Sequence, residues 1–497
     1  MPFGLKDNDY KLIKNVFHSI SKIEEVIVFG SRAMGTDKPA SDVDLALKGK
    51  DITLDDILKL KHKLEELPII YDFDVINYET INTPALIEHI DRHGILFYKK
   101  DIVPKDWKTY SLGDFAEINP KISLKQGQEY SFVEMKDLDA TFKYVSPSTK
   151  KELKGGSKFQ NGDTLFARIT PCLENGKICQ VKNLENNVGF GSTEFLVFRG
   201  RKNVSDSDFV YYLSRSEFVK NNAIQLMTGS SGRQRVEKST LAELEIIVPK
   251  DIETQKQIAH ILTSLDDKIE LNLQMNQNLE AMAQALFKEW FVDFKFPGFD
   301  GVLVNGLPKG WKKEALDEKI SFLNGLALQK FPPKNETEYL PVIKIRELKQ
   351  GILESSDKAS TEIDKKYIIE DGDILFSWSG SLEVVMWCNG KGALNQHLFK
   401  VSSEKYPKWF YYYWVKEYLS IFQATAADKA TTMGHIQRRH LTESLISVPD
   451  KDTFKLANEN LEPLLERIKS NAIQIQTLIQ TRNNLLPRLM SGKISIK

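Results

Sequence analysis

The chain has 497 residues, of which 41% are hydrophobic and 27% are charged, as in ordinary globular proteins. Its 68 basic residues balance 68 acidic residues, so overall charge gives no sign of nucleic-acid binding and any basic surface must be local. None of the three cysteines lies in a C-x-x-C pair, which argues against a zinc site or a disulfide framework.

The length predicts about three domains. The first residues lack an apolar signal core, and no run reaches the ~18 apolar residues that a membrane span needs. We therefore expect a cytoplasmic protein with reduced thiols and no membrane partner.

Residues 1–100 alternate between helical and strand-like patterns, which predicts a small α/β domain. Apolar residues at helical spacing favour a helix, and short continuous apolar runs favour a buried strand. Glycine and serine after the first strand suit a tight turn that opens a helix. The predicted helices lie at 8–20 and 54–67, and the predicted strands lie at 26–29, 41–47 and 73–76.

Three aspartates in this domain point to metal chemistry. Asp42 and Asp44 are two residues apart on a predicted strand, so their side chains lie on the same face. Two such carboxylates repel each other and are tolerated best with a divalent cation between them. Asp74, on the third strand, is expected to complete the cluster. Mg²⁺ bridging to substrate phosphates suits these ligands, and Gly30 with Ser31 is expected to cradle the phosphates.

The order G-S-R-A-x-G-T, S-D-V-D-L and F-D-V, up to Tyr98, resembles the minimal nucleotidyltransferases of the polymerase-β-like superfamily. The resemblance implies that Asp42, Asp44 and Asp74 bind Mg²⁺ and that Ser31 touches a nucleoside triphosphate. It also implies transfer of a nucleoside monophosphate to an acceptor hydroxyl, with Asp74 as the general base. A degenerate copy retained as an adaptor is the alternative.

The rest of the chain is an internal duplication, in which residues 107–294 and 311–494 carry the same sequence pattern. Each copy opens with Trp-Lys, continues through a Gly-Asp-x-Leu-Phe strand and a Val-Pro segment, and closes with a long amphipathic helix. The repeat of about 200 residues far exceeds the ~20–50 residues of solenoid repeats. We therefore expect a duplicated domain with pseudo-twofold symmetry, which suggests a target in two parts.

Polar loops in both copies are candidate DNA contacts. Aromatic helices at 209–213 and 409–414 are expected in the core rather than stacked on bases, because their aromatic residues have helical spacing. The loops before Leu241 and Leu441 are small and basic. Arg and Gln bind base edges while Ser, Thr and Lys hold phosphates, although solvated loops are the alternative. The candidates are Arg168, Ser230, Ser231, Arg233, Gln234, Arg235, Ser377, Ser379, Thr431, Thr432, His435, Gln437 and Arg438.

Each copy ends in a helix whose three-four alternation predicts a coiled-coil seam. A helix of ~40 residues rises about 60 Å, so it serves as a spacer. The polar seam residues Asn272, Asn276 and Arg482 are expected to specify register at some cost in stability. Antiparallel pairing of the helices would hold the two copies at opposite ends. The seams are Leu262, Leu265, Ile269, Asn272, Asn276, Leu279, Ala283, Leu286 and Trp290, and Leu461, Leu465, Ile468, Ala472, Ile475, Ile479, Arg482, Leu486 and Leu489.

The Trp-Lys-x-x-x-Leu start, the Gly-Asp-x-Leu-Phe strand and the terminal L-L-P-R-L-M-S-G-K-I resemble the specificity subunits of type I restriction–modification systems. The resemblance implies a bipartite double-stranded DNA site, two docked methyltransferase subunits, associated restriction subunits, and no cofactor for this part. The expected fold is a multidomain α+β protein with two β-rich target-recognition domains separated by antiparallel coiled-coil helices. The expected boundaries are 1–100 for the nucleotidyltransferase-like domain, 101–250 and 311–450 for target recognition, 251–296 and 451–497 for the helices, and 297–310 for the linker.

Two other functions stay open. In the first, the chain is a Mg²⁺-dependent nucleotidyltransferase, and its repeats serve only to bring it to DNA. In the second, it is an interaction protein whose N-terminal domain is catalytically inert and recruits a partner. The N-terminal domain is the departure from the specificity-subunit pattern, and the resemblance does not explain it.

Overall fold

The computed structural model describes residues 2–18, 20, 22–38, 41–100, 104–230, 232–428 and 434–494. The chain forms two compact units: the first comprises the residues up to Trp107 together with the described C-terminal residues from Ser491, and the second spans Lys108–Met490. Within the described residues, no helix combines the length and the apolar character that crossing a membrane requires.

The N-terminal unit is a four-stranded sheet in the order β3-β2-β1-β4 with helices on both faces. Strand β1 runs antiparallel to β2 and β4, whereas β2 runs parallel to β3. One face packs against α1 and α3 and the other against α4, so the central strands β1 and β2 bury apolar residues on both sides. The predicted strands and helices are confirmed. The elements are α1 (Asp7–His18), β1 (Glu25–Phe29), α2 (Gly30–Met34), β2 (Val43–Lys48), α3 (Leu54–Glu65), β3 (Phe73–Asn77), α4 (Pro84–His93) and β4 (Ile95–Lys99).

The first copy is built on two sheets, in the orders β10-β13-β7-β9 and β6-β14-β11-β12-β8, and a separate strand pair joins β5 to β17. Its elements are β5 (Trp107–Ser111), α5 (Leu112–Phe115), β6 (Ala116–Ile118), β7 (Glu129–Val133), β8 (Tyr144–Val145), β9 (Thr149–Glu152), β10 (Ser157–Gln160), β11 (Thr164–Ala167), β12 (Ile178–Val181), β13 (Val188–Gly191), β14 (Phe195–Gly200), α6 (Ser207–Arg215), α7 (Glu217–Gln225), β15 (Met227–Thr228), β16 (Arg235–Val236), α8 (Lys238–Ala242) and β17 (Glu245–Pro249).

The second copy also has two sheets, in the orders β21-β28-β25-β26 and β23-β22-β27-β24, and a strand pair joins β20 to β29. Its elements, with the short hairpin that precedes them, are β18 (Leu303–Val304), β19 (Leu307–Pro308), β20 (Lys312–Ala315), β21 (Ser321–Asn324), β22 (Leu340–Ile343), α10 (Ile345–Gln350), β23 (Lys358–Ala359), β24 (Ile368–Ile369), β25 (Ile374–Ser377), β26 (Val384–Met386), β27 (Gly392–Leu394), β28 (Leu398–Ser402), α11 (Lys408–Asp428), α12 (Arg438–Glu443) and β29 (Leu445–Val448).

The two copies share one topology, which confirms the duplication. The order β6-β14-β11-β12 of the first copy matches β21-β28-β25-β26 of the second, and β10-β13-β7-β9 matches β24-β27-β22-β23. Strand directions match as well, because β7 runs parallel to β13 just as β22 runs parallel to β27. The first copy adds β8 at one sheet edge.

The aromatic helices lie in the core, as expected from their spacing. In α6, Tyr211 and Tyr212 are buried, and in α11 the whole run from Trp409 to Trp414 is buried. The rings of α11 pack against one another and against Phe287 and Phe291 of α9. These aromatic residues therefore hold each copy on a long helix and are not available to stack on bases.

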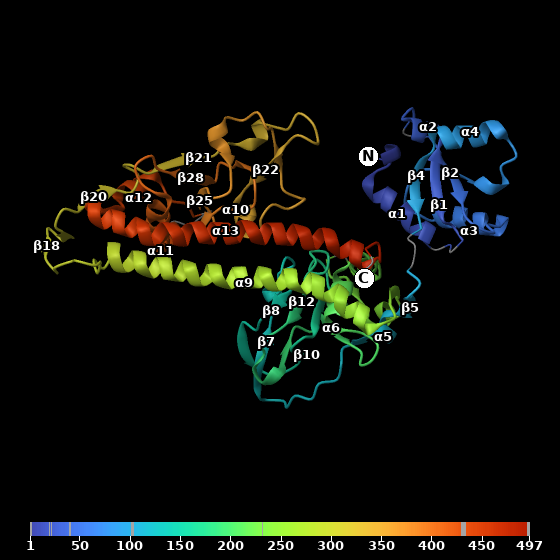
Figure 1. Cartoon of the computed structure of the whole chain (residues 1–497), viewed down its shortest axis with the longest axis horizontal. Helices are drawn as coiled ribbons and strands as arrows, with labels where there is room; N and C mark the ends of the chain where they lie inside the picture. The colour runs from blue at the N-terminus through green and yellow to red at the C-terminus, as the bar shows by residue number, and fades with distance from the viewer. Residues whose placement is uncertain are drawn as a thin grey trace. The chain divides into compact units, whose positions relative to one another are not determined.

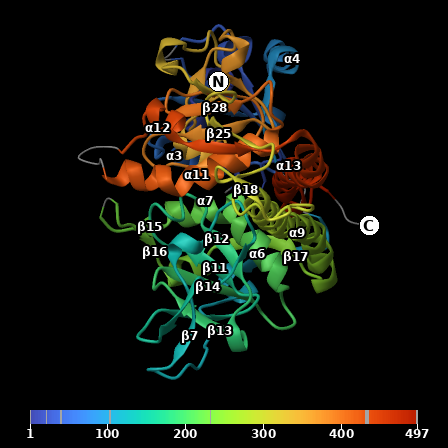
Figure 2. The same ribbon diagram turned by 90° about the vertical axis from the view of Figure 1, so that its left-hand side faces the viewer.

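The long helices α9 (Ile252–Phe291) and α13 (Lys451–Met490), each of 40 residues, lie side by side along their length (Figure 1). A view along them, in Figure 2, shows the same pairing. Asp266 contacts Arg482 and Asn276 contacts Ile468, so the chains run in opposite directions. The predicted antiparallel coiled-coil pair is confirmed.

Each copy packs at its own end of the helix pair. Near one end, Arg482 donates to the Thr141 carbonyl of the first copy, and Tyr212 donates to Asp266. Toward the other end, Glu280 accepts from Lys416 of the second copy. The expected separation of the two copies by the helices follows from these contacts.

The observed seam departs from the predicted one at Leu265, Leu286 and Ala472. These three residues are half-buried, whereas their neighbours Asp266, Phe287 and Asn471 are buried. A straight helix has 3.6 residues per turn, so its buried stripe drifts relative to a strict three-four pattern. All three predicted polar seam residues do bridge the helices: Asn272 to Gln474 at 2.7 Å, Asn276 to the Ile468 carbonyl at 3.1 Å, and Arg482 to Asp266 at 2.6 Å.

Candidate functional site

Gly30 and Asp44 form the closest-packed part of the N-terminal site. Gly30 follows β1 and opens α2 with a φ of 70°, and Phe29 pairs with Asp44 across the sheet. A Cβ on residue 30 would collide with the Asp44 carboxylate unless that side chain moved, and the positive φ is one that glycine adopts without strain. The turn into α2 therefore passes directly over the carboxylate, as a phosphate-binding turn would require.

Of the three predicted carboxylates, Asp42 and Asp74 both lie near Asp44. Asp44 and Asp74 are register neighbours on the parallel strands β2 and β3, and Asp42 immediately precedes β2. Partial burial, followed by the charges of Asp74 and Asp42, raises the pKa of Asp44. Such mutual repulsion is what a cation would relieve.

No three side chains of the Asp, Glu, His or Cys type, among the residues that the structure describes, converge closely enough to hold a metal by themselves. Asp74 is exposed and lies 3.5 Å from the ammonium of Lys61. The residues present fit a cation that Asp42 and Asp44 hold together with substrate phosphates, since Mg²⁺ is commonly bound by one or two carboxylates plus phosphate. The three-carboxylate set stays a prediction.

Arg32 belongs to the G-S-R-A-x-G-T motif but was not among the site residues predicted from the sequence. It is buried, and its guanidinium donates to the carbonyls of Ser41 at 2.5 Å and Asp42 at 3.1 Å. It also donates to the Phe3 carbonyl at 3.0 Å. Arg32 therefore holds the backbone that carries Asp42. Ser31 is half-buried on α2, beside Gly30.

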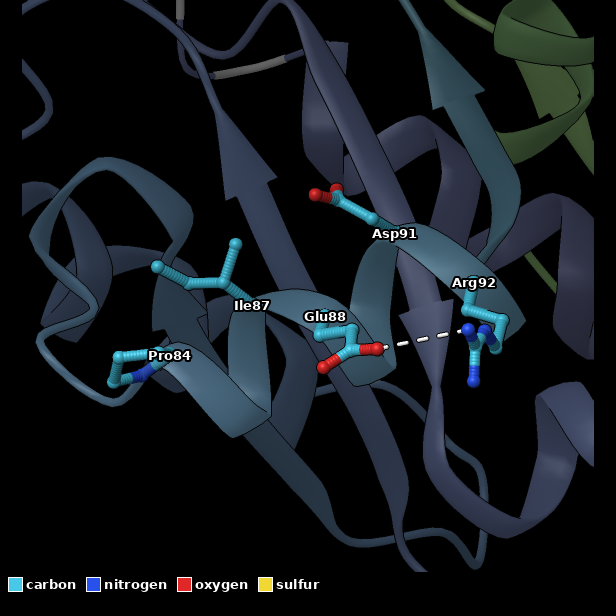
Figure 3. A pocket seen from close by; sticks show the side chains of 5 residues that line it. All are labelled: Pro84, Ile87, Glu88, Asp91 and Arg92. Atoms are coloured by element: carbon cyan, nitrogen blue, oxygen red, sulfur yellow. Dashed lines mark ion pairs between the residues drawn. The ribbon is translucent and has the colours of Figure 1, made fainter.

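A surface hollow on α4 is a poor candidate for the site. It is lined by Pro84, Ile87, Glu88, Asp91 and Arg92, all on one helix, as Figure 3 shows. Its charged lining residues are already paired, since Glu88 lies 3.6 Å from Arg92 and Asp91 accepts from the Tyr78 hydroxyl at 2.6 Å. Ligand sites are concave and enclose their ligand, which one helix cannot do.

In the first copy, the predicted loops come together. Strands β15 and β16 form a hairpin whose tip holds Ser230 and Arg233, and Ile169 forms a bridge with Arg235. The Thr170 amide donates to the Gln234 carbonyl at 3.1 Å, and the Gln234 amide donates to the Thr170 hydroxyl at 3.1 Å. Segments some 65 residues apart therefore share one surface, as β-pairing allows.

Carboxylates hold two of the predicted arginines. Arg168 donates to Glu237 at 2.8 Å, and Arg235 donates to both oxygens of Glu194 at 2.7–3.0 Å. The hydrogen bonds from Arg235 lower the pKa of Glu194. Arg233 is exposed, and its side chain makes no hydrogen bond or ion pair within the described part of the chain. Sequence reasoning missed Glu194 and Glu237, because nothing local marks a carboxylate as a distant arginine's partner.

In the second copy, the equivalent segments meet in the same way. Ser379 forms a bridge with His435, as Ile169 does with Arg235. The Ile436 amide donates to the Trp378 carbonyl at 3.1 Å, matching the bond of 3.0 Å from Val236 to Arg168. The duplication thus extends to the geometry of the candidate loops.

The chemistry of the second copy's loops is different. Trp378 is half-buried, donates to Asn324 at 3.0 Å, and packs near the rings of His397 and His435. The Ser379 hydroxyl lies 3.1 Å from Nδ1 of His397. The loops therefore combine aromatic and neutral polar groups where the first copy has ion pairs. No sequence motif marks Asn324 or His397 as a candidate site residue.

The remaining candidate DNA contacts differ in whether their side chains are exposed and free to meet a ligand. Ser377 is 0% exposed and its hydroxyl bonds the Ser381 carbonyl at 2.7 Å, so its side chain serves the loop and does not face a ligand. Arg438 is exposed and donates to the Phe322 carbonyl at 3.2 Å. Gln437 is exposed at the start of α12. Ser231, Thr431 and Thr432 lie outside the described residues.

Comparison with known protein families finds a match for each part of the chain. The family described as "Type I restriction modification DNA specificity domain" matches residues 104–281 and 308–481. The family described as "Polymerase beta, Nucleotidyltransferase" matches residues 11–103.

Curated relatives match over most of the chain. The type I restriction enzyme MjaIX specificity subunit of Methanocaldococcus jannaschii is 27% identical over 437 residues, which cover 81% of this chain and 97% of that protein. The type I restriction enzyme HindI specificity subunit of Haemophilus influenzae is 26% identical over 466 residues, which cover 78% of this chain and 100% of that protein.

Among solved structures, a type I restriction–modification S subunit from M. genitalium aligns with a TM-score of 0.44 and 14% identity, over 77% of this chain and 96% of that one. The twofold match of the specificity family covers more than half of the chain, and its two segments coincide with the two copies. This chain therefore belongs to the type I restriction–modification DNA specificity family, with an N-terminal domain that resembles minimal nucleotidyltransferases.

Proposed function

We propose that this chain is the DNA sequence-specificity subunit of a type I restriction–modification complex. The two copies act as target-recognition domains that bind the two halves of a bipartite double-stranded site. The helix pair α9–α13 sets the distance between the half-sites and docks two methyltransferase subunits, with which restriction subunits associate. The protein would act in the cytoplasm, beside the DNA that it recognises.

One observation carries this proposal: two domains of the same topology bring equivalent loops together and present different chemistry there. In the first copy Arg235 is clamped by Glu194, and in the second His435 takes the same bridging position next to Trp378. Matched scaffolds with unmatched loops suit recognition of two different half-sites, because base contacts come from a few side chains on each module.

The test is selection of DNA from a randomised pool by this chain in complex with its methyltransferase partner. The expected result is two short blocks of preferred bases at a constant separation. A single block, or no base preference, would overturn the proposal. Salt dependence should accompany binding, since phosphate contacts release counterions.

We propose a second function for the N-terminal domain: Mg²⁺-dependent transfer of a nucleoside monophosphate to a hydroxyl of a partner protein, with release of pyrophosphate. The observation that favours it is the Gly30 backbone lying over Asp44, next to Asp74 in register. Asp42 and Asp44 would hold the cation, which neutralises the triphosphate when bound. Asp74 would accept the proton of the attacking hydroxyl.

Label transfer from a radioactive nucleoside triphosphate tests this second function. Asp42→Ala with Asp44→Ala should abolish transfer to the complex or to a candidate acceptor. Asp55→Ala is the matched control, because Asp55 is exposed on α3 and, within the described residues, its ion pair is with Lys59 on the same helix. Transfer that survives in the double variant would remove this site from consideration.

A further inference from the structure

Arg235 is held at both its backbone and its side chain. Its backbone pairs with Thr228 in the hairpin and forms the bridge to Ile169. Its Nε donates to Glu194 at 2.9 and 3.0 Å, and its Nη2 donates to Glu194 at 2.7 Å. A two-point pairing of this kind fixes the plane of the guanidinium.

Glu194 is itself anchored. Its amide donates to the Ser192 hydroxyl at 3.1 Å, and its carbonyl accepts from the Arg168 amide at 3.0 Å. The side chain of Glu194 is three-quarters covered, whereas that of Arg235 is 38% exposed. The carboxylate therefore sits behind the guanidinium and presents it to solvent.

The pairing leaves one edge of the guanidinium for a ligand. A guanidinium has five N–H donors, and Glu194 occupies the Nε–Nη2 edge. On the opposite edge, the contact that Nη1 makes within the described residues is a long one, 3.4 Å to the Arg233 carbonyl. Nη1 and the second proton of Nη2 thus remain as a pair of donors on a side chain that is 38% exposed.

Two acceptor pairs in DNA match such donors: the O6 and N7 atoms of guanine, and the oxygens of a phosphate. The surroundings decide between them. Glu194 offsets the charge of Arg235, and Glu237 offsets that of Arg168, which weakens the attraction of these two arginines for a phosphate. A guanine edge carries acceptors without a net charge, so its recognition depends on the geometry of the donors rather than on the net charge of the pair.

We propose that Arg235 recognises a guanine in the half-site of the first target-recognition domain, and that Glu194 is the positioning residue for its guanidinium. The proposal rests on the specificity function proposed above. In the second domain, His435 takes the bridging position of Arg235. The guanine requirement at this position is therefore confined to one half-site.

The experiment compares the wild-type chain with Arg235→Gln and Glu194→Gln, each in complex with the methyltransferase partner, by selection from DNA randomised at both half-sites. Arg235→Gln should reduce the preference for guanine at one position by roughly tenfold to hundredfold. Glu194→Gln should reduce it at the same position while binding to unselected DNA stays equal or rises, because a negative charge near the DNA is removed.

Arg233→Gln is the matched control, since Arg233 lies two residues away, is exposed and is not clamped. It should weaken binding to all sequences alike and reduce the salt slope by about 1, as expected of a phosphate contact. Retained preference at the second half-site shows in every variant that the chain has folded.

The outcomes separate the two proposals. If the wild-type complex has no base preference, the specificity function itself fails. If it has two preferred blocks but Arg235→Gln leaves the first block unchanged, the assignment of Arg235 fails and the specificity function stands. If Glu194→Gln lowers binding to every sequence with the guanine preference intact, Glu194 is only structural and its positioning role is overturned.

Discussion

The stability that an ion pair contributes in the first target-recognition domain depends on whether its carboxylate is charged. Hydrogen bonds from Arg235 lower the pKa of Glu194 below its ordinary value of 4.5. A carboxylate whose pKa is lowered on folding stabilises the fold above its unfolded pKa, and this contribution is lost as pH falls through the lowered value.

We therefore expect the difference in thermal midpoint between wild type and Glu194→Gln to be constant from neutral pH to about pH 5 and to shrink at lower pH. Thermal unfolding followed by circular dichroism at several pH values measures it. A difference that already vanished near neutral pH would mean that the pair contributes nothing as an ion pair.

Thiol reactivity is a second property decided residue by residue. Burial raises the pKa of Cys179 to about 12 and that of Cys388 to about 11. The thiolate is the reactive form, so both thiols should resist alkylation in the folded protein at about pH 8, whereas half-buried Cys172 should react first. Mass spectrometry of labelled peptides measures this, with urea-unfolded protein as the control. Fast labelling of Cys179 in the folded chain would contradict the expectation.

At the scale of elements, the helix pair is fixed by a buried polar cluster. Arg482 of α13 donates to Asp266 of α9 at 2.6 Å and to the Thr141 carbonyl at 2.9 Å, and Asp266 also accepts from Tyr212 at 2.6 Å. One arginine thus joins two helices and the first domain. Buried ion pairs are better attested as specifiers of register than as sources of net stability.

Removing one partner of this cluster should be costly. Arg482→Ala leaves the Asp266 charge buried without its partner, and we expect a loss of about 3–5 kcal/mol in the free energy of unfolding. Arg467→Ala is the control, because Arg467 is exposed on the same helix and a surface change should stay within about 0.5 kcal/mol. Urea denaturation compares the two. Equal stability of both variants would show that the cluster does not hold the helices.

At the scale of the whole molecule, the two units have separate cores and separate chemistry. The N-terminal core is built from its own sheet and helices, and the cores of the second unit contain none of its residues. We therefore expect the double variant Asp42→Ala with Asp44→Ala to keep the wild-type DNA target profile when it is assembled with the methyltransferase.

Selection from a randomised DNA pool, run in parallel on wild type and the double variant, tests this independence. Matching blocks, spacing and affinity are the expected outcome. A changed target profile would mean that the nucleotidyltransferase-like domain takes part in recognition. Added nucleoside triphosphate with Mg²⁺ should leave the wild-type profile unchanged for the same reason.

Patterns confined to short stretches of sequence were enough to predict most elements. The continuous apolar run at 26–29 became a largely buried strand, because a sheet covered on both faces needs apolar residues on both sides. The duplication and the coiled-coil seams were also predicted, because repeated motifs and three-four spacing can be recognised in the sequence without knowledge of contacts.

The partners of the candidate side chains were decided only by tertiary structure. Arg235 and Glu194 are 41 residues apart, and their pairing depends on which strands and loops fold onto one another. Ser377 looked like an available hydroxyl but is fully buried at the end of β25. Sequence alone therefore determined that two similar frames carry two different sets of loops. Packing decided which loop residues face solvent and which serve the frame, because that depends on contacts between distant segments.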